Sequence, residues 1–110
     1  MPRMRALSIQ QPAADLIFRG IKKCEFRSIH TLIRERVYVY ASLKKPTRED
    51  LAAWGYDKDE LPRGVLIGTV EIVDCEDVGP SYAWHLKKPK RLKSLPKPRN
   101  HPQPVFFYPY

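Results

Sequence analysis

Polar and apolar residues alternate near the start of the chain, over residues 4–10. Alternation with a period of two is typical of a β-strand, whose successive side chains point to opposite faces. We therefore predict a strand over 4–10, with Leu7 and Ile9 facing the core. Ser8 and Gln10 then lie on the opposite face, where their uncharged polar groups can form hydrogen bonds.

The next segment has a helical pattern instead. Apolar residues recur on one stripe between Ala13 and Ile17, and Pro12 precedes them at a position where a helix tolerates its missing N–H group. Gly20 can adopt the left-handed conformation that ends a helix. These features predict a helix of about two turns over 11–19 that buries one face.

Two-residue alternation returns directly after this helix. Cys24 and Phe26 are predicted to be buried, and Glu25 and Arg27 to point to the opposite face, close to Lys22. A carboxylate and two cations thus meet within a few residues. We expect a concave polar cleft here, and we expect Tyr40 and Ser42 of a neighbouring strand to line it too. The residues predicted to form the cleft itself are Ser8, Gln10, Lys22, Glu25 and Arg27.

The middle and the end of the chain predict further strands and one more helix. Residues 36–42 alternate branched and aromatic side chains, as a strand does. Thr47 is a suitable N-cap for a short helix. A long strand is expected over 64–75, with a bend or bulge at Gly68, and 105–108 are expected to add a closing strand.

Several motifs in register resemble one family. These are Leu7–Pro12, the Gly-x-Lys-x-x-Glu-x-Arg pattern over 20–27, Pro62–Val70, and the Tyr-Ala-Trp-His-Leu run at 82–86. Together they resemble the activating signal cointegrator homology (ASCH) family. The resemblance implies an α+β protein: a small PUA-like β-barrel, similar to an RNA-binding fold, with two or three short helices. We expect residues 1–110 to form a single such domain.

The resemblance also implies a function. The family is associated with RNA, and the Lys, Glu and Arg of its pattern line a cleft, which places Lys22, Glu25 and Arg27 there. We prefer a module that binds RNA or a modified nucleoside. The alternative is an RNA-processing hydrolase, either a ribonuclease or an N4-acetylcytidine amidohydrolase, with Lys22 stabilising charge and Glu25 moving a proton. The amidohydrolase branch has a threonine nucleophile where this chain has Glu25, which argues against that chemistry.

Charge is distributed unevenly along the chain. The net charge is +8, all twelve acidic residues precede position 78, and residues 81–110 contain seven of the twenty lysines and arginines. A basic surface attracts polyphosphate chains, although such a run is also compatible with a simple solvated face. RNA or a nucleoside is therefore the expected partner; the sequence identifies no protein partner. The residues predicted to bind RNA outside the cleft are Lys44, Lys87, Lys88, Lys90 and Arg91.

Composition limits the class of protein to which the chain can belong. With 110 residues, of which 43% are hydrophobic, the chain can form a modest core, and it has no apolar run long enough to cross a membrane, so we expect a cytoplasmic protein. Cys24 and Cys75 are expected to be reduced core thiols, with a nucleophilic Cys24 as the alternative. The three histidines are scattered. No metal site or cofactor is predicted, which leaves open a loosely bound divalent cation.

Overall fold

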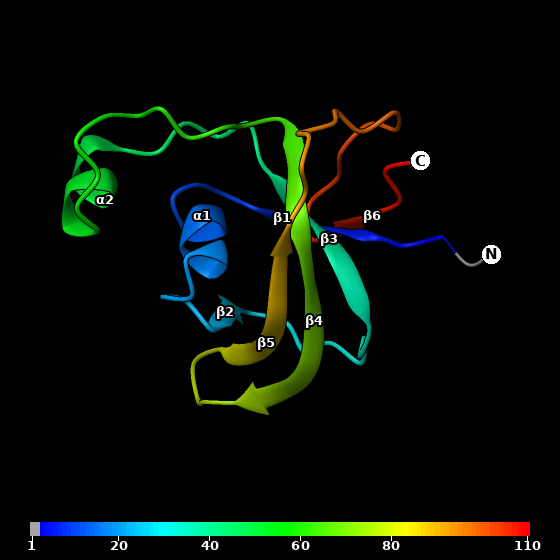
Figure 1. Cartoon of the computed structure of the whole chain (residues 1–110). Helices are drawn as coiled ribbons and strands as arrows, with labels where there is room; N and C mark the ends of the chain where they lie inside the picture. Colours follow the sequence, from blue (N-terminus) through cyan, green and yellow to red (C-terminus); the bar gives the residue numbers. More distant parts are fainter. Residues whose placement is uncertain (1–2) are drawn as a thin grey trace.

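The computed structural model describes residues 3–110, so the first two residues of the predicted domain lie outside the described part (Figure 1). It has a curled, mixed sheet of six strands in the order β2-β5-β4-β3-β1-β6, together with two short helices. This confirms the predicted α+β, PUA-like class. The elements are β1 (Ala6–Ile9), α1 (Ala13–Phe18), β2 (Cys24–Arg27), β3 (Arg36–Ala41), α2 (Arg48–Ala53), β4 (Val65–Asp77), β5 (Tyr82–Arg91) and β6 (Phe106–Phe107).

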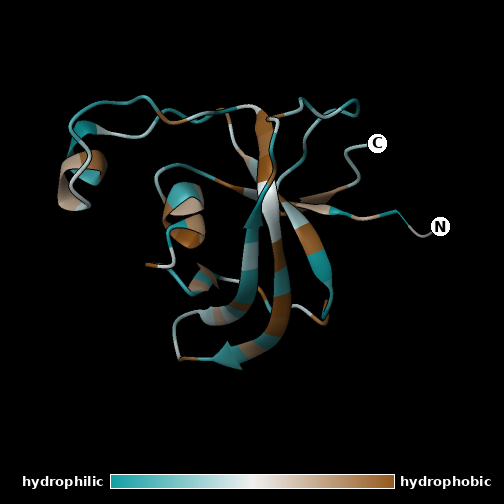
Figure 2. Ribbon diagram, in the orientation of Figure 1, coloured by the Kyte–Doolittle hydropathy of each residue, from teal (hydrophilic) through white to brown (hydrophobic). Residues whose placement is uncertain are grey.

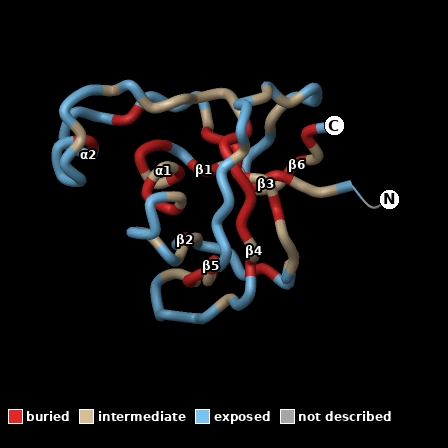
Figure 3. Tube along the Cα trace, viewed as in Figure 1, coloured by how far each residue is buried: buried red, intermediate tan, exposed pale blue. Residues whose placement is uncertain are grey.

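The core lies between the inner face of the sheet and α1. Strand β1 runs parallel to β3 and lies between β3 and the edge strand β6, and Leu7 and Ile9 are buried as predicted. Figure 2 shows hydrophobic residues concentrated along β3 and β4, and Figure 3 shows burial on β1, α1, β3 and the upper part of β4. Trp84 of β5 is fully buried, and its indole N–H donates to the carbonyl of Ile29 at 3.1 Å. The apolar pattern of the sequence thus fixes which faces meet in the core.

Strand β4 carries the curl of the sheet. The pairing of β3 with β4 shifts between Val39 and Tyr40, which leaves Ile67 as an extra residue beside Gly68. A Cβ on Gly68 would overlap the ring of Phe18 and lie 2.6 Å from the carbonyl oxygen of Lys90. Glycine is therefore required because α1 and β5 both approach the backbone here, and the predicted bend at this residue is confirmed.

The helices are short and occupy different places. Helix α1 begins after Pro12 and is followed by Gly20, whose φ is +77°; the helix packs against β3 and β5. Helix α2 is capped by the Thr47 hydroxyl, which accepts a hydrogen bond from the Asp50 N–H, and it stands away from the sheet (Figure 1). Neither helix within residues 3–110 has the length and apolar character needed to span a bilayer.

Candidate functional site

Strand β2 lies at one edge of the sheet, and its two faces are the reverse of our expectation. Glu25 is only 8% exposed, whereas Phe26, which we predicted to be buried, is 57% exposed and Cys24 is half-buried. The reason is the register with β5: Glu25 is opposite Trp84, whose side chain points to the interior. The alternation correctly groups Glu25 with Arg27, but it is this pair that faces inward.

Two cations hold the Glu25 carboxylate. Lys22 Nζ lies 3.5 Å from Oε1, and an Arg27 guanidinium nitrogen lies 3.2 Å from Oε2. The same guanidinium nitrogen donates to the backbone carbonyl of Ser8 at 2.6 Å, and the guanidinium also lies over the Trp84 ring, 5.7 Å from its centroid. A carboxylate this buried is tolerated only when it is paired, so the network fixes the geometry of the strand entrance.

A cleft of about 350 Å³ opens over this network. It is walled by β1 on one side, by β2 on another, and by the segment before β6, where Pro104 and Val105 lie. The hydroxyl of Ser8 donates to the carbonyl of Gln103 at 3.0 Å, which ties that last segment to β1. Of the predicted residues, the structure brings together in this cleft Ser8, Gln10, Glu25, Arg27 and Ser42.

Two other predicted cleft residues lie elsewhere. Lys22 reaches Glu25 but lines the adjacent hollow rather than the cleft itself. Tyr40 is 3% exposed and packs edge-on against Phe107, with ring centroids 5.3 Å apart. Burial raises the pKa of the Tyr40 hydroxyl above its ordinary value. Tyr40 instead lines, with Ser8, Ser42 and Pro104, another hollow beside the cleft.

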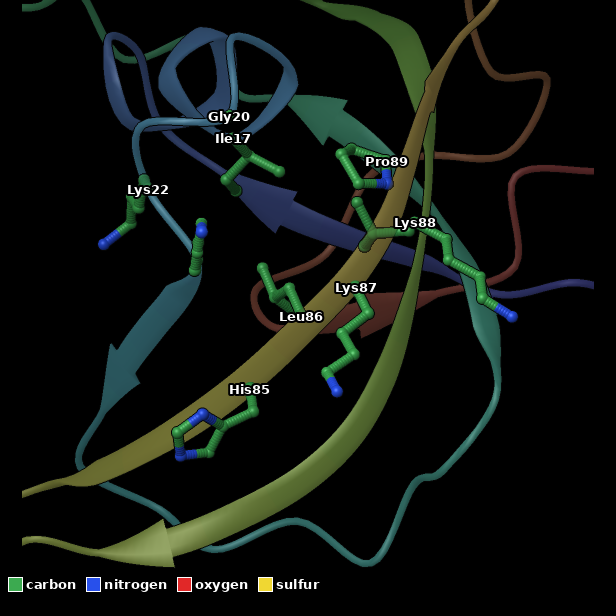
Figure 4. A pocket seen from close by; sticks show the side chains of 10 residues that line it. Ile17, Gly20, Lys22, His85, Leu86, Lys87, Lys88 and Pro89 are labelled. Carbon is green, nitrogen blue, oxygen red and sulfur yellow. The ribbon is translucent and has the colours of Figure 1, made fainter.

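A second hollow, of about 440 Å³, lies between the end of α1 and β5 (Figure 4). Figure 4 shows Lys22 on the segment that follows α1, and His85, Lys87 and Lys88 along β5 on the other side of the hollow. Its apolar floor is formed by Ile17, Val70 and Leu86, and its basic rim by Lys22, Lys23, Lys87 and Lys88. We call this hollow the lysine cavity. Lys22 stands between it and the Glu25 cleft.

The basic residues of β5 are exposed, but acidic residues from other strands and helices partly balance them. Lys88 Nζ lies 4.0 Å from Glu71 of β4, and Arg91 is paired with Asp15 of α1 at 3.1 Å. Residues 81–110 contain no acidic residue, and the partners come from distant parts of the sequence, so these ion pairs could not be foreseen from it. Lys90 is exposed on the same strand, whereas Lys44 lies in the loop between β3 and α2 and lines neither hollow.

Sequence reasoning missed several residues of the two hollows. Lys23 and His85 line the lysine cavity, and Pro104 and Val105 wall the cleft. The Lys-Lys pair before β2 was the only available signal for Lys23. The proline-rich segment before β6 has no periodicity, so nothing in it indicates that it folds back over β1.

The family model for the ASCH domain matches residues 7–103, which include every residue that lines the lysine cavity and all those that line the cleft except Pro104 and Val105. The chain belongs to the ASCH domain family. It is 36% identical over 80 residues, 63% of its length, to human activating signal cointegrator 1, and 35% identical over 80 residues, again 63% of its length, to the mouse protein of that name. The chain spans about 14% of either relative. ASCH domains are associated with RNA binding.

Proposed function

We propose that this ASCH domain binds RNA or a modified nucleoside, with one base or nucleoside in the Glu25 cleft. The observation that carries the proposal is the paired Glu25–Arg27 network at the floor of a 350 Å³ hollow. That volume is within the range of about 300–1,000 Å³ found for small-molecule sites. Backbone and side-chain polar groups of β1, β2 and Ser42 surround the space and can read the edge of a base.

The phosphate backbone is assigned to the basic side chains next to the cleft. Lys23, Lys87 and Lys88 line the lysine cavity and Lys90 lies further along β5, whereas Lys22 is paired with Glu25 and belongs to the base-binding side. Lysine ammonium groups contact phosphates without reading sequence, whereas contacts to base edges carry specificity. The two hollows thus support a division of labour between base recognition and phosphate binding.

The charge pairing favours binding over hydrolysis at the same site. A general base needs a carboxylate oxygen that is free to take a proton, and each oxygen of Glu25 has a cationic neighbour. The proposed alternative, a ribonuclease or amidohydrolase that uses Lys22 and Glu25, would have to use a remaining lone pair of this carboxylate or separate the ion pairs. Breaking an ion pair in a partly buried site costs free energy, so we place the hydrolase second.

The test combines binding and turnover in one sample. A labelled single-stranded RNA of ten nucleotides is titrated with the chain, and the same mixture is then incubated with Mg²⁺ or Mn²⁺ and checked for cleavage; acetylated cytidine is incubated in parallel. The proposal predicts binding with both substrates left intact. Turnover that falls by about 10²-fold or more in Glu25→Gln would instead establish the hydrolase. Absence of RNA and nucleoside binding at low salt would refute the proposed function.

A further inference from the structure

Three side chains that do not line the Glu25 cleft form a continuous hydrogen-bonded series. Cys24 Sγ of β2 lies 3.3 Å from His85 Nδ1 of β5, and His85 Nε2 lies 2.9 Å from Glu76 Oε1 of β4. Cys24 and His85 are directly opposite each other in the antiparallel pairing of the two strands. Three adjacent strands of one sheet therefore hold a thiol, an imidazole and a carboxylate in fixed order.

The order of these groups determines which ring nitrogen of His85 carries the proton. An ionised carboxylate can only accept hydrogen bonds, so Glu76 favours the tautomer with the proton on Nε2. Nδ1 then presents its lone pair to the Cys24 thiol. This is the arrangement in which a base, oriented by a third group, takes the proton of a nucleophile.

The surroundings of the thiol select for negatively charged reactants. Cys24 follows Lys22 and Lys23 directly, and His85 lines the lysine cavity together with Lys87 and Lys88. The thiol is half-buried and the imidazole partly exposed, so a small molecule can approach them. The lysine side chains of the cavity attract anionic reactants.

We propose that Cys24 is a modification site that forms a mixed disulfide with a small, acidic disulfide. His85 Nδ1 takes the thiol proton, and the Cys24 sulfur attacks one sulfur of the disulfide. The new S–S bond forms as the old one breaks, so the Cys24 sulfur is oxidised and the departing sulfur is reduced. The departing thiolate takes the proton back from His85, and Glu76 stabilises the imidazolium that exists in between.

Cys75 provides a matched control within the same chain. It is also a free, half-buried cysteine, but it packs against the apolar core cluster. Among the hydrogen bonds of residues 3–110, an imidazole partner is found for Cys24 and not for Cys75. The two cysteines are thus alike in exposure and both are free thiols, whereas only Cys24 contacts the His85–Glu76 pair.

The experiment treats the reduced full chain with oxidised glutathione, an acidic disulfide, at neutral pH and follows adducts by intact mass and peptide mapping. We expect the adduct at Cys24 to form about tenfold faster than at Cys75 and to be released by dithiothreitol. His85→Asn should slow the Cys24 reaction by about tenfold, Glu76→Gln by a smaller factor, and His101→Asn not at all. Circular dichroism verifies that each variant is folded.

A second pair of probes isolates the role of charge. Lys23→Gln should slow the reaction with oxidised glutathione more than the reaction with neutral hydroxyethyl disulfide. Equal rates at Cys24 and Cys75 in the unaltered chain would overturn the proposal without any variant. An unchanged Cys24 rate in folded His85→Asn would overturn it as well.

Discussion

The two hollows on either side of Lys22 differ in how their charges are arranged. In the Glu25 cleft, anion and cation are already paired inside the protein. In the lysine cavity, four lysines surround an apolar floor, and of these Lys22 is paired with Glu25 and Lys88 lies 4.0 Å from Glu71. The first arrangement presents directed hydrogen-bonding groups, and the second presents an excess of positive charge. A polymer with neutral bases and charged phosphates requires both.

The largest effect is expected from breaking the paired network. Arg27→Ala leaves the buried Glu25 with one partner and removes the hydrogen bond to the Ser8 carbonyl. We expect the free energy of unfolding to fall by about 2–4 kcal/mol. Urea unfolding measures it, with Arg99→Ala, at an exposed arginine, as the control that should stay within about 0.5 kcal/mol. Equal stability of the two variants would show that the network is not structural.

Charge reversal on β5 tests the phosphate-binding side of the comparison. Replacing Lys87, Lys88 and Lys90 with glutamate should weaken RNA binding by more than about tenfold for all sequences alike, because phosphate contacts carry no sequence information. The dependence of log affinity on log salt concentration should become shallower, with the magnitude of its slope reduced by about 2. The matched control reverses three exposed lysines outside β5, namely Lys45, Lys58 and Lys97. If the control weakens binding equally, the effect is one of net charge only.

Two neighbouring lysines, Lys22 and Lys23, allow the two hollows to be tested one at a time. Lys22 pairs with Glu25, whereas Lys23 lines only the lysine cavity. Lys22→Ala should lower the affinity for the preferred base by about three- to tenfold, with little change in the salt slope. Lys23→Ala should leave the base preference unchanged and reduce the magnitude of the salt slope by about 0.7. Anisotropy titrations with homopolymeric RNAs at several salt concentrations measure both quantities. Identical behaviour of the two variants would remove the distinction between the hollows.

The smallest effect concerns the buried tyrosine beside the cleft, Tyr40. Burial raises the pKa of Tyr40 above its ordinary value of 10.0, so the unfolded chain ionises before the folded chain does. The stability due to this residue is complete below pH 10 and is lost as the pH rises through the raised pKa of the folded state. In urea unfolding between pH 8 and 11, Tyr40→Phe should flatten the decline and Tyr110→Phe should not. A decline of the same steepness in both variants would contradict this assignment.

The sequence predicted much of the fold because its periodicities are strong. Alternation over residues 4–10 placed Leu7 and Ile9 in the core, and Thr47 capped a helix where expected. Gly68 marked the bend because no other residue avoids contact with Phe18 and β5. Each of these features depends on local chemistry, which a single sequence records.

The candidate site was less accessible from sequence because it depends on pairing between distant segments. Alternation correctly put Glu25 and Arg27 on one face, but the apolar character of Phe26 suggested the wrong face as the buried one. Only the register with β5 shows that the Trp84 indole already fills the interior there. The same applies to Pro104, since its contact with the cleft arises from the last segment folding back across β1.

The most direct test of the account is to map where a short single-stranded RNA contacts the ¹⁵N-labelled chain by NMR. The account predicts the largest amide shifts at Ser8, Arg27 and Ser42 in the cleft, together with smaller, salt-sensitive shifts along Lys87 and Lys88. A single nucleoside should reproduce only the first group. Shifts centred on α2 and its loops, with the Glu25 cleft unaffected, would contradict the central claim.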